Sequence, residues 1–227
     1  MKIFLKDIKH YFLTVDTNGI RKHHMMEEFK EYNLTEVNPI LNISRNKSGA
    51  TGFSKILDIG LRNQNRTLPF QPFVMYEDDS SKYREFPEYI EVPDDTDLLY
   101  IGLSKGSMND TNDQVGCYYK HINNDIIRIY NMLAMHGIIV CSASGALAIQ
   151  KSLLEDYYKN MPWDISLAYI QFYYNVYALK DPLVYQDGKY GGCEGSTKFS
   201  ITSSLDSPLP TEYINTTNDS IITCCYK

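Results

Sequence analysis

Strand-like and helix-like segments alternate over the first third of the chain, and this alternation limits the possible folds more than any other feature. Residues 9–16 (KHYFLTVD) are rich in β-forming residues, and residues 20–33 have apolar positions near helical spacing. A short strand is predicted within 36–41, a second helix over 49–64 and a third strand over 70–76. Strands that alternate with helices predict an α/β sandwich with a mostly parallel central sheet.

The rest of the chain continues this pattern less regularly, which predicts a smaller mixed sheet in the same domain. Residues 84–97 are expected to be irregular and 106–114 to form an exposed loop. Helices are predicted over 143–160 and 161–179, the second with Pro162 in its first turn. Apolar runs predict strands over five further segments: 98–104, 115–122, 126–135, 137–142 and 181–187.

Charge and hydropathy exclude several classes of protein. The net charge is −6 and no basic stripe is present, so a nucleic-acid-binding surface is not expected. No apolar run is long enough to span a membrane. Charges at Lys6, Asp7 and Lys9 interrupt the N-terminal apolar stretch, so we expect no signal peptide and a cytoplasmic location.

Three acids, Glu77, Asp78 and Asp79, follow the strand predicted over 70–76 without a break. Two carboxylates about 4 Å apart repel by roughly 4 kcal/mol at an effective dielectric constant near 20. Ligands of open α/β sheets bind beyond the carboxyl ends of the strands, and hard oxygen ligands there suit Mg²⁺ or Mn²⁺. The sequence therefore predicts a divalent cation at these acids, with a solvated acidic turn as the alternative.

Two helix starts also carry candidate residues. Asp164 adjoins Trp163, the only tryptophan, so the pair is interpreted either as a helix start with a capping acid or as an acid and an indole that face a sugar. Ser144 and Gly145 open the helix predicted over 143–160. Amides at such a helix start bind anions or sugar hydroxyls, and Ser144 as a simple N-cap is the alternative.

Several blocks of sequence, in the same order, resemble the GT-A glycosyltransferases. They are most similar to the family that includes lipopolysaccharide sugar transferases and procollagen galactosyltransferases, and related domains occur in large algal viruses. The resemblance covers about residues 9–193 and rests on YFLTVD, GFSKILDIGL, VMYEDD, LLYIGLS, SASGALAIQKSLLE, PWDISLAYIQ and YALKDPLVYQDGKYGG.

The resemblance implies a GT-A fold and a metal-dependent glycosyltransferase. Such an enzyme moves a sugar from a nucleotide diphosphate sugar, here expected to be a UDP-sugar, to a hydroxyl of a glycan or glycoprotein, with Mn²⁺ or Mg²⁺ as cofactor. The GT-A domain would span 1–196, with a nucleotide-binding half over about 1–104 and an acceptor half over about 105–196. Residues 197–227 would be an extension or a domain boundary. For a virus-encoded protein, the location would be the host-cell cytoplasm.

By the same resemblance, Asp79 would bind the metal directly and Glu77 would reach the metal or the ribose, while Asp78 would share the cation or the nucleotide. Asp164 would be the catalytic base. The family usually completes its metal site with a late His or Asp. No His follows His136, so Asp187 is the substitute, and its neighbour Gln186 is assigned to sugar or acceptor binding together with Trp163, Ser144 and Gly145. The nucleotide would lie against Thr14, Val15, Asp16 and Arg21.

Two other functions remain open from the sequence. A nucleotidyl- or phosphotransferase would use a similar sheet, but the P-loop pattern G-x-x-x-x-G-K-[ST] is absent. A sugar-binding module without catalytic activity is the other alternative, and the complete Glu77–Asp79 triplet favours an enzyme over it.

Overall fold

The helices and strands follow each other along the chain nearly as predicted. The computed structural model describes residues 1–15, 19–104, 117–191, 201 and 205–206; Asp16 and the loop expected over 106–114 lie outside them. The elements are β1 Lys2–Phe4, β2 Lys9–Leu13, α1 Ile20–Glu28, β3 Leu34–Val37, α2 Arg45–Arg62, β4 Phe73–Glu77, β5 Ser80–Lys82, β6 Tyr89–Glu91, β7 Leu98–Tyr100, β8 Tyr118–His121, β9 Ile126–Tyr130, β10 Ile138–Val140, α3 Ala143–Lys159, α4 Ile165–Ile170, β11 Val176–Leu179, β12 Val184–Gln186 and the 3₁₀ turn η1 Gly188–Tyr190.

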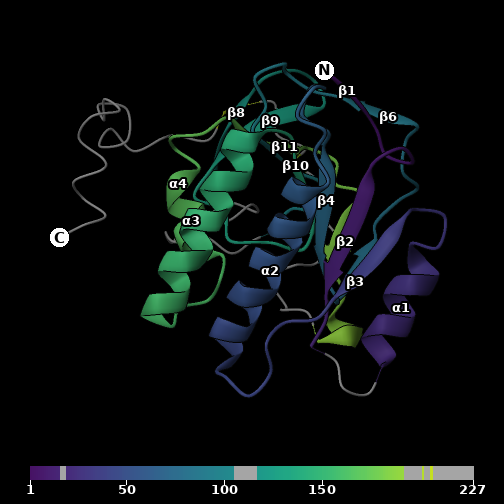
Figure 1. Cartoon of the computed structure of the whole chain (residues 1–227). Coiled ribbons are helices and arrows are strands. Elements are labelled where there is room, and N and C mark those ends of the chain that lie inside the picture. Colours follow the sequence, from purple (N-terminus) through teal and green to yellow (C-terminus); the bar gives the residue numbers. More distant parts are fainter. Residues whose placement is uncertain (16–18, 105–116, 192–200, 202–204, 207–227) are drawn as a thin grey trace.

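Eight strands form one sheet in the order β3-β2-β4-β10-β7-β11-β9-β8 (Figure 1). β3, β2 and β4 are parallel to one another, and β7 is parallel to β11. β10 is antiparallel to both β4 and β7, and β9 is antiparallel to both β11 and β8. Six strands therefore run one way and two run the other, which confirms the α/β class with a mostly parallel central sheet. In place of one smaller mixed sheet, β1–β6 and β12–β5 form two antiparallel ribbons.

Alternation of side chains along the strands builds a core on each face of the sheet. Met75 of β4 lies in the cluster that α2 and α3 cover. Its neighbour Tyr76 lies on the other face, with Met25 of α1 and the C-cap residue Phe29. The close approach of α2 depends on Gly52, because a Cβ there would lie 2.1 Å from a methyl carbon of Leu13. The layer order is therefore helix, sheet, helix.

The order in which the chain adds strands to the sheet reverses at β2. β2 lies between β3 and β4, so the connection through α1 leads to one side of β2 and the connection through α2 leads to the other. Leu13 is paired with Glu77 at the carboxyl ends of β2 and β4. We call this end of the sheet the carboxyl edge and the opposite end the amino edge. In open α/β sheets, ligands bind where strand order reverses in this way.

The helix predicted over 161–179 is only partly present. α4 ends at Ile170, and Val176–Leu179 form β11 in the interior of the sheet, between β7 and β9. All four β11 residues are buried, so the segment lacks the alternation of apolar and polar residues that distinguishes a strand from a helix. The stretch expected to be irregular over 84–97 also contains a strand, β6.

Ile201 packs against the main body of the described structure. Ile201 is 7% exposed within the core that α2 and α3 cover, and its backbone N–H donates to the carbonyl of Lys180 at 2.8 Å. Within the described residues, no helix combines the length and the apolar character that crossing a bilayer requires.

Candidate functional site

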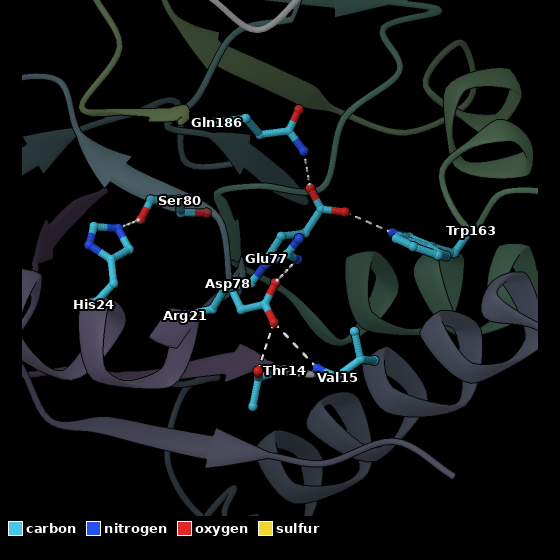
Figure 2. A network of polar contacts seen from close by, with 9 residues as sticks. All are labelled: Thr14, Val15, Arg21, His24, Glu77, Asp78, Ser80, Trp163 and Gln186. Atoms are coloured by element: carbon cyan, nitrogen blue, oxygen red, sulfur yellow. Dashed lines mark hydrogen bonds and ion pairs between the residues drawn. The ribbon is translucent and has the colours of Figure 1, made fainter. Parts of the chain in front are cut away.

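Asp78 joins the ends of β2 and β4 to the start of α1. Its Oδ2 accepts hydrogen bonds from the Thr14 hydroxyl at 2.7 Å and from the Val15 backbone N–H at 3.3 Å. Its Oδ1 pairs with Arg21 Nη1 at 2.9 Å (Figure 2). The structure therefore brings together four of the residues predicted to bind the nucleotide. Because both oxygens of Asp78 have protein partners, we assign Asp78 to positioning Arg21 and the loop after β2.

Glu77 is held from two distant parts of the chain. Trp163 Nε1 donates to its Oε1 at 3.0 Å, and Gln186 Nε2 donates to its Oε2 at 2.6 Å (Figure 2). Burial, followed by the charges of Asp79 and Asp164, raises the pKa of Glu77 well above its usual range, although the bond from Trp163 opposes this. The carboxylates of this edge therefore repel one another as the sequence indicates.

Asp79 is the acid whose environment is incomplete. It is 7% exposed, and its Oδ1 is buried without a hydrogen-bond partner. Burial and then the charge of Asp78 raise its pKa to about 6, while Arg21 lowers it. A buried polar atom without a partner is rare in folded proteins, because its lost hydration is not replaced. Asp79 Oδ1 is thus the atom at this edge that an added cation would complete.

Asp187 does not join Glu77 and Asp79 in a metal-binding cluster, contrary to its predicted role. Its backbone N–H donates to the Asp79 carbonyl at 2.8 Å, so it lies beside the acids. Its carboxylate, however, accepts from Ser81 Oγ at 3.3 Å, Tyr185 OH at 3.2 Å and the Lys189 N–H at 3.0 Å, and so caps η1. Among the described residues, no three His, Cys, Asp or Glu side chains are grouped to hold a metal.

The residues present nevertheless fit a divalent cation that is only partly held by protein. Mg²⁺ is commonly bound by one or two carboxylates, while water and substrate phosphates fill its other positions. Asp79 supplies one such carboxylate oxygen, and the basic pocket described below supplies a place for phosphates. The part of the site that fits such a cation is therefore the buried Oδ1 of Asp79.

Asp164 occupies the N-cap position of α4, but its side chain makes no capping hydrogen bond. Burial raises its pKa, and its charge in turn raises the pKa of Glu77. The neighbouring Trp163 directs its N–H to Glu77, and its ring covers Gly49 of α2, where an added Cβ would lie 2.2 Å from a ring carbon. Asp164 and Trp163 thus lie with the acids of the carboxyl edge.

Ser144 and Gly145 do not lie with these residues. β10 runs antiparallel to β4, and Val140 at its end pairs with Phe73 at the start of β4, so α3 begins at the amino edge. The N-cap of α3 is Ser142, whose Oγ accepts from the Gly145 N–H at 2.9 Å. Gly145 packs against backbone, because a Cβ there would lie 2.3 Å from the carbonyl oxygen of Asp97. The structure thus places both residues away from the site that they were assigned to.

A pocket of about 280 Å³ is lined by Arg21, the partner of Asp78, and by residues that the sequence analysis missed. Its two cationic side chains are Arg21 from the start of α1 and Lys189 from η1. Gly191 has a φ of 93°, and a Cβ there would lie 2.3 Å from Arg21 Nη2, so glycine shapes this wall. The complete lining is Ile20, Arg21, Lys189, Tyr190 and Gly191.

His24 fixes this pocket to the strand that follows the acids. Its Nε2 lies 2.9 Å from the Ser80 carbonyl (Figure 2). The same nitrogen lies 2.9 Å from Ser81 Oγ, and the ring stacks on Tyr190 with centroids 3.8 Å apart. The glycine-rich sequence GKYGG after β12 was the available signal for a pocket wall, but the partner of Tyr190 could not be read from sequence.

Comparisons with known proteins add little to this description. No protein-family model matches the sequence, and no curated protein matches it either. Among solved structures, the chain is similar to CTP:phosphocholine cytidylyltransferase from Streptococcus pneumoniae, with 12% sequence identity and a TM-score of 0.39. The match covers 79% of this chain and 93% of that one. A similarity of this size identifies neither a family nor an activity.

Proposed function

We propose that this protein is a metal-dependent glycosyltransferase that uses a UDP-sugar as donor and a hydroxyl of a glycan or glycoprotein as acceptor. The observation that carries the proposal is Asp79, a buried carboxylate with an unpartnered oxygen at the point where the strand order reverses. It follows Asp78, which holds Arg21 at the mouth of a basic pocket. The resemblance of the sequence to GT-A enzymes selects a sugar as the group transferred.

Each part of the site has a task in this reaction. Arg21 and Lys189 would face the diphosphate, since both line the pocket and carry positive charge. Asp79 would hold Mn²⁺ or Mg²⁺, which when bound neutralises charge on the leaving diphosphate. Asp164 would accept the proton of the acceptor hydroxyl, because burial makes its carboxylate more basic than an exposed aspartate. Glu77, held by Trp163 and Gln186, would position the neighbouring acids.

The test is calorimetric titration of UDP into the protein, with Mn²⁺ and with EDTA, on the wild type and two variants. Asp79→Asn removes the charge but keeps the shape, and Asp125→Asn makes the same change at an exposed position. We expect Mn²⁺-dependent binding in the wild type and in Asp125→Asn, weakened by about a hundredfold in Asp79→Asn, as expected for removing a buried charged ligand. Metal-independent binding, or equal binding by both variants, would overturn the metal site.

A nucleotidyltransferase is the second candidate, because two cations in one pocket also suit a triphosphate. The products distinguish the two reactions. A glycosyltransferase releases UDP from a UDP-sugar, whereas a nucleotidyltransferase releases pyrophosphate from UTP or CTP. Metal-dependent UDP binding without either product would favour the sugar-binding module instead.

A further inference from the structure

The loop between β3 and α2, residues 38–44, carries three exposed apolar side chains. Ile40 is 50% exposed, Leu41 is 56% exposed and Ile43 is 38% exposed. Figure 1 shows this loop at the lower edge of the molecule, below the start of α2. Single exposed apolar residues are ordinary, but three within four positions form a patch of the kind that marks an interaction site. We call residues 38–44 the apolar loop.

Positive charge surrounds the apolar loop. Arg45 and Lys47 follow it directly, and Lys55 Nζ donates to the Asn38 carbonyl at 2.9 Å, which brings a third cation to its base. No acid occurs from residue 37 to residue 57, although the whole chain has a net charge of −6. In the part of the chain that the structure describes, none of these three cations forms an ion pair. Glu36 before the loop and Glu155 of α3 are themselves paired with lysines, and Asp58, three residues after Lys55, accepts a hydrogen bond from Gln150 at 3.5 Å.

The apolar loop is held in a defined shape rather than left to collapse. Ser48 Oγ donates to the Ile40 carbonyl at 3.0 Å. Ser44 Oγ and Asn46 Nδ2 donate to Asn160, at the end of α3, at 2.5 Å and 2.7 Å. Two residues before Asn160, Tyr158 is 76% exposed. Hydrogen bonds to α2 and α3 therefore hold the backbone that carries the exposed apolar side chains.

We propose that the apolar loop docks this protein on a membrane surface that contains anionic lipids. Ile40, Leu41 and Ile43 would enter the boundary between headgroups and acyl chains, while the three cations contact lipid phosphates. Tyrosine is favoured at the same depth, which suits Tyr158. This inference is independent of the group that the enzyme transfers.

The cations favour lipid over a second copy of this chain. In a two-fold interface the same patch would meet itself, so Arg45, Lys47 and Lys55 would approach their own copies. Like charges at close range disfavour such an association. An anionic bilayer offers both the apolar phase and the opposite charge.

Sedimentation with phosphatidylcholine vesicles, with and without phosphatidylglycerol, tests the proposal on the full chain. We expect the wild type to bind the anionic vesicles preferentially. The variant Ile40→Ser/Leu41→Ser/Ile43→Ser should bind them at least about tenfold more weakly. Arg45→Gln/Lys47→Gln should lose most of the preference for anionic lipid, a factor of about five for each cation.

The matched control is Leu147→Ser/Leu154→Ser, which removes apolar side chains that are 51% and 55% exposed on α3. It should bind vesicles like the wild type. The substituted side chains are exposed, apart from Lys47, which is partly buried with its Nζ 5.0 Å from the centre of the Tyr157 ring. Each variant should therefore stay within a few degrees of the wild-type unfolding temperature, which is measured alongside. The proposal is overturned if the wild type ignores anionic vesicles or if the triple serine variant binds them unchanged. It is also overturned if ultracentrifugation shows a dimer that the triple serine variant abolishes.

Discussion

Each of the two edges of the central sheet contains a buried or partly buried aspartate. Both carboxylate oxygens of Asp97 accept hydrogen bonds, whereas Asp79 has an oxygen without a partner. At the amino edge, Asp97 accepts from Ser142 Oγ at 2.6 Å and from the Asn175 N–H at 3.0 Å, and its carbonyl accepts from the Cys141 N–H at 2.9 Å. At the carboxyl edge, Asp79 keeps a buried oxygen without a partner, and its pKa is raised to about 6.

Under the proposed function, this difference separates a structural carboxylate, Asp97, from a metal-binding one, Asp79. Asp97 ties the starts of β7, α3 and β11 together, so its bonds are complete without any ligand. Asp79 lies beside Asp78 and close to Glu77, where the folded chain leaves repulsion and an unmet hydrogen-bond acceptor in place. The repulsion and the unpartnered oxygen destabilise the carboxyl edge, and a bound cation would relieve both.

We expect the largest change in the free energy of unfolding from a substitution at the amino edge. Asp97→Ala leaves the Ser142 hydroxyl and the Asn175 N–H without their acceptor, which we expect to lower the free energy of unfolding by about 2 to 4 kcal/mol. Urea denaturation measures this change, and Asp94→Ala, at a 95% exposed side chain, serves as the control with little effect. Metal-dependent UDP binding by the folded fraction of Asp97→Ala should be unchanged. A stable Asp97→Ala protein that no longer binds UDP would reverse our assignment of the two edges.

Asp79→Asn should raise the free energy of unfolding, in contrast to Asp97→Ala, and the size of the increase should depend on pH. The pKa of Asp79 rises from an ordinary 3.8 to about 6 on folding. Its contribution to stability is therefore most favourable below about pH 4 and is lost as the pH rises through about 6. Above about pH 7, without metal, Asp79→Asn should be more stable than the wild type by on the order of 1 to 3 kcal/mol.

Below about pH 4 the two proteins should have similar free energies of unfolding, because Asp79 is then protonated in both folded and unfolded chains. Urea denaturation at the two pH values, in the presence of EDTA, measures both differences. A variant that is destabilised equally at both pH values would show that Asp79 is a structural acid like Asp97.

The smallest effect is expected in the wall of the basic pocket. Gly191→Ala adds a Cβ at a φ of 93°, at a point 2.3 Å from Arg21 Nη2. The left-handed conformation costs about 1 kcal/mol for alanine, and Arg21 must also move. We expect UDP to bind a few-fold more weakly by calorimetry. Gly188→Ala, three residues earlier, places a Cβ with no atom within 4 Å and should bind UDP normally. Equal affinities would exclude Arg21 from the donor site.

The sequence predicted the first half of the fold well, because each element there has one dominant pattern. β2, α1, α2 and β4 show either helical spacing or a short β-rich run. The error over 161–179 came from a continuous apolar segment whose strand, Val176–Leu179, is specified by pairing with β7 and β9. Such pairing depends on residues far away in sequence, and no local pattern reports it.

The site residues that follow parallel strands could be predicted from the sequence. Asp78 contacts Thr14 because β2 and β4 are parallel neighbours. Ser144 and Gly145 were misplaced because β10 runs the other way, which the sequence of the strand does not reveal. The carboxylate of Asp187 has several partners in the fold, and its use as a helix cap was likewise not visible in the sequence.

The contact between Glu77 and Gln186 joins residues 109 positions apart, and it has a consequence for how the site is acquired during folding. The acids of the carboxyl edge are synthesised early, but the strand and turn that face them, β12 and η1, are synthesised last among the described elements. A nascent chain that ends before β12 therefore exposes these carboxylates to water, where their repulsion is weak. The bonds that Gln186 donates to Glu77 and that the Asp187 N–H donates to the Asp79 carbonyl can form only after this late segment has been made, so the two acids reach their final environment late in synthesis.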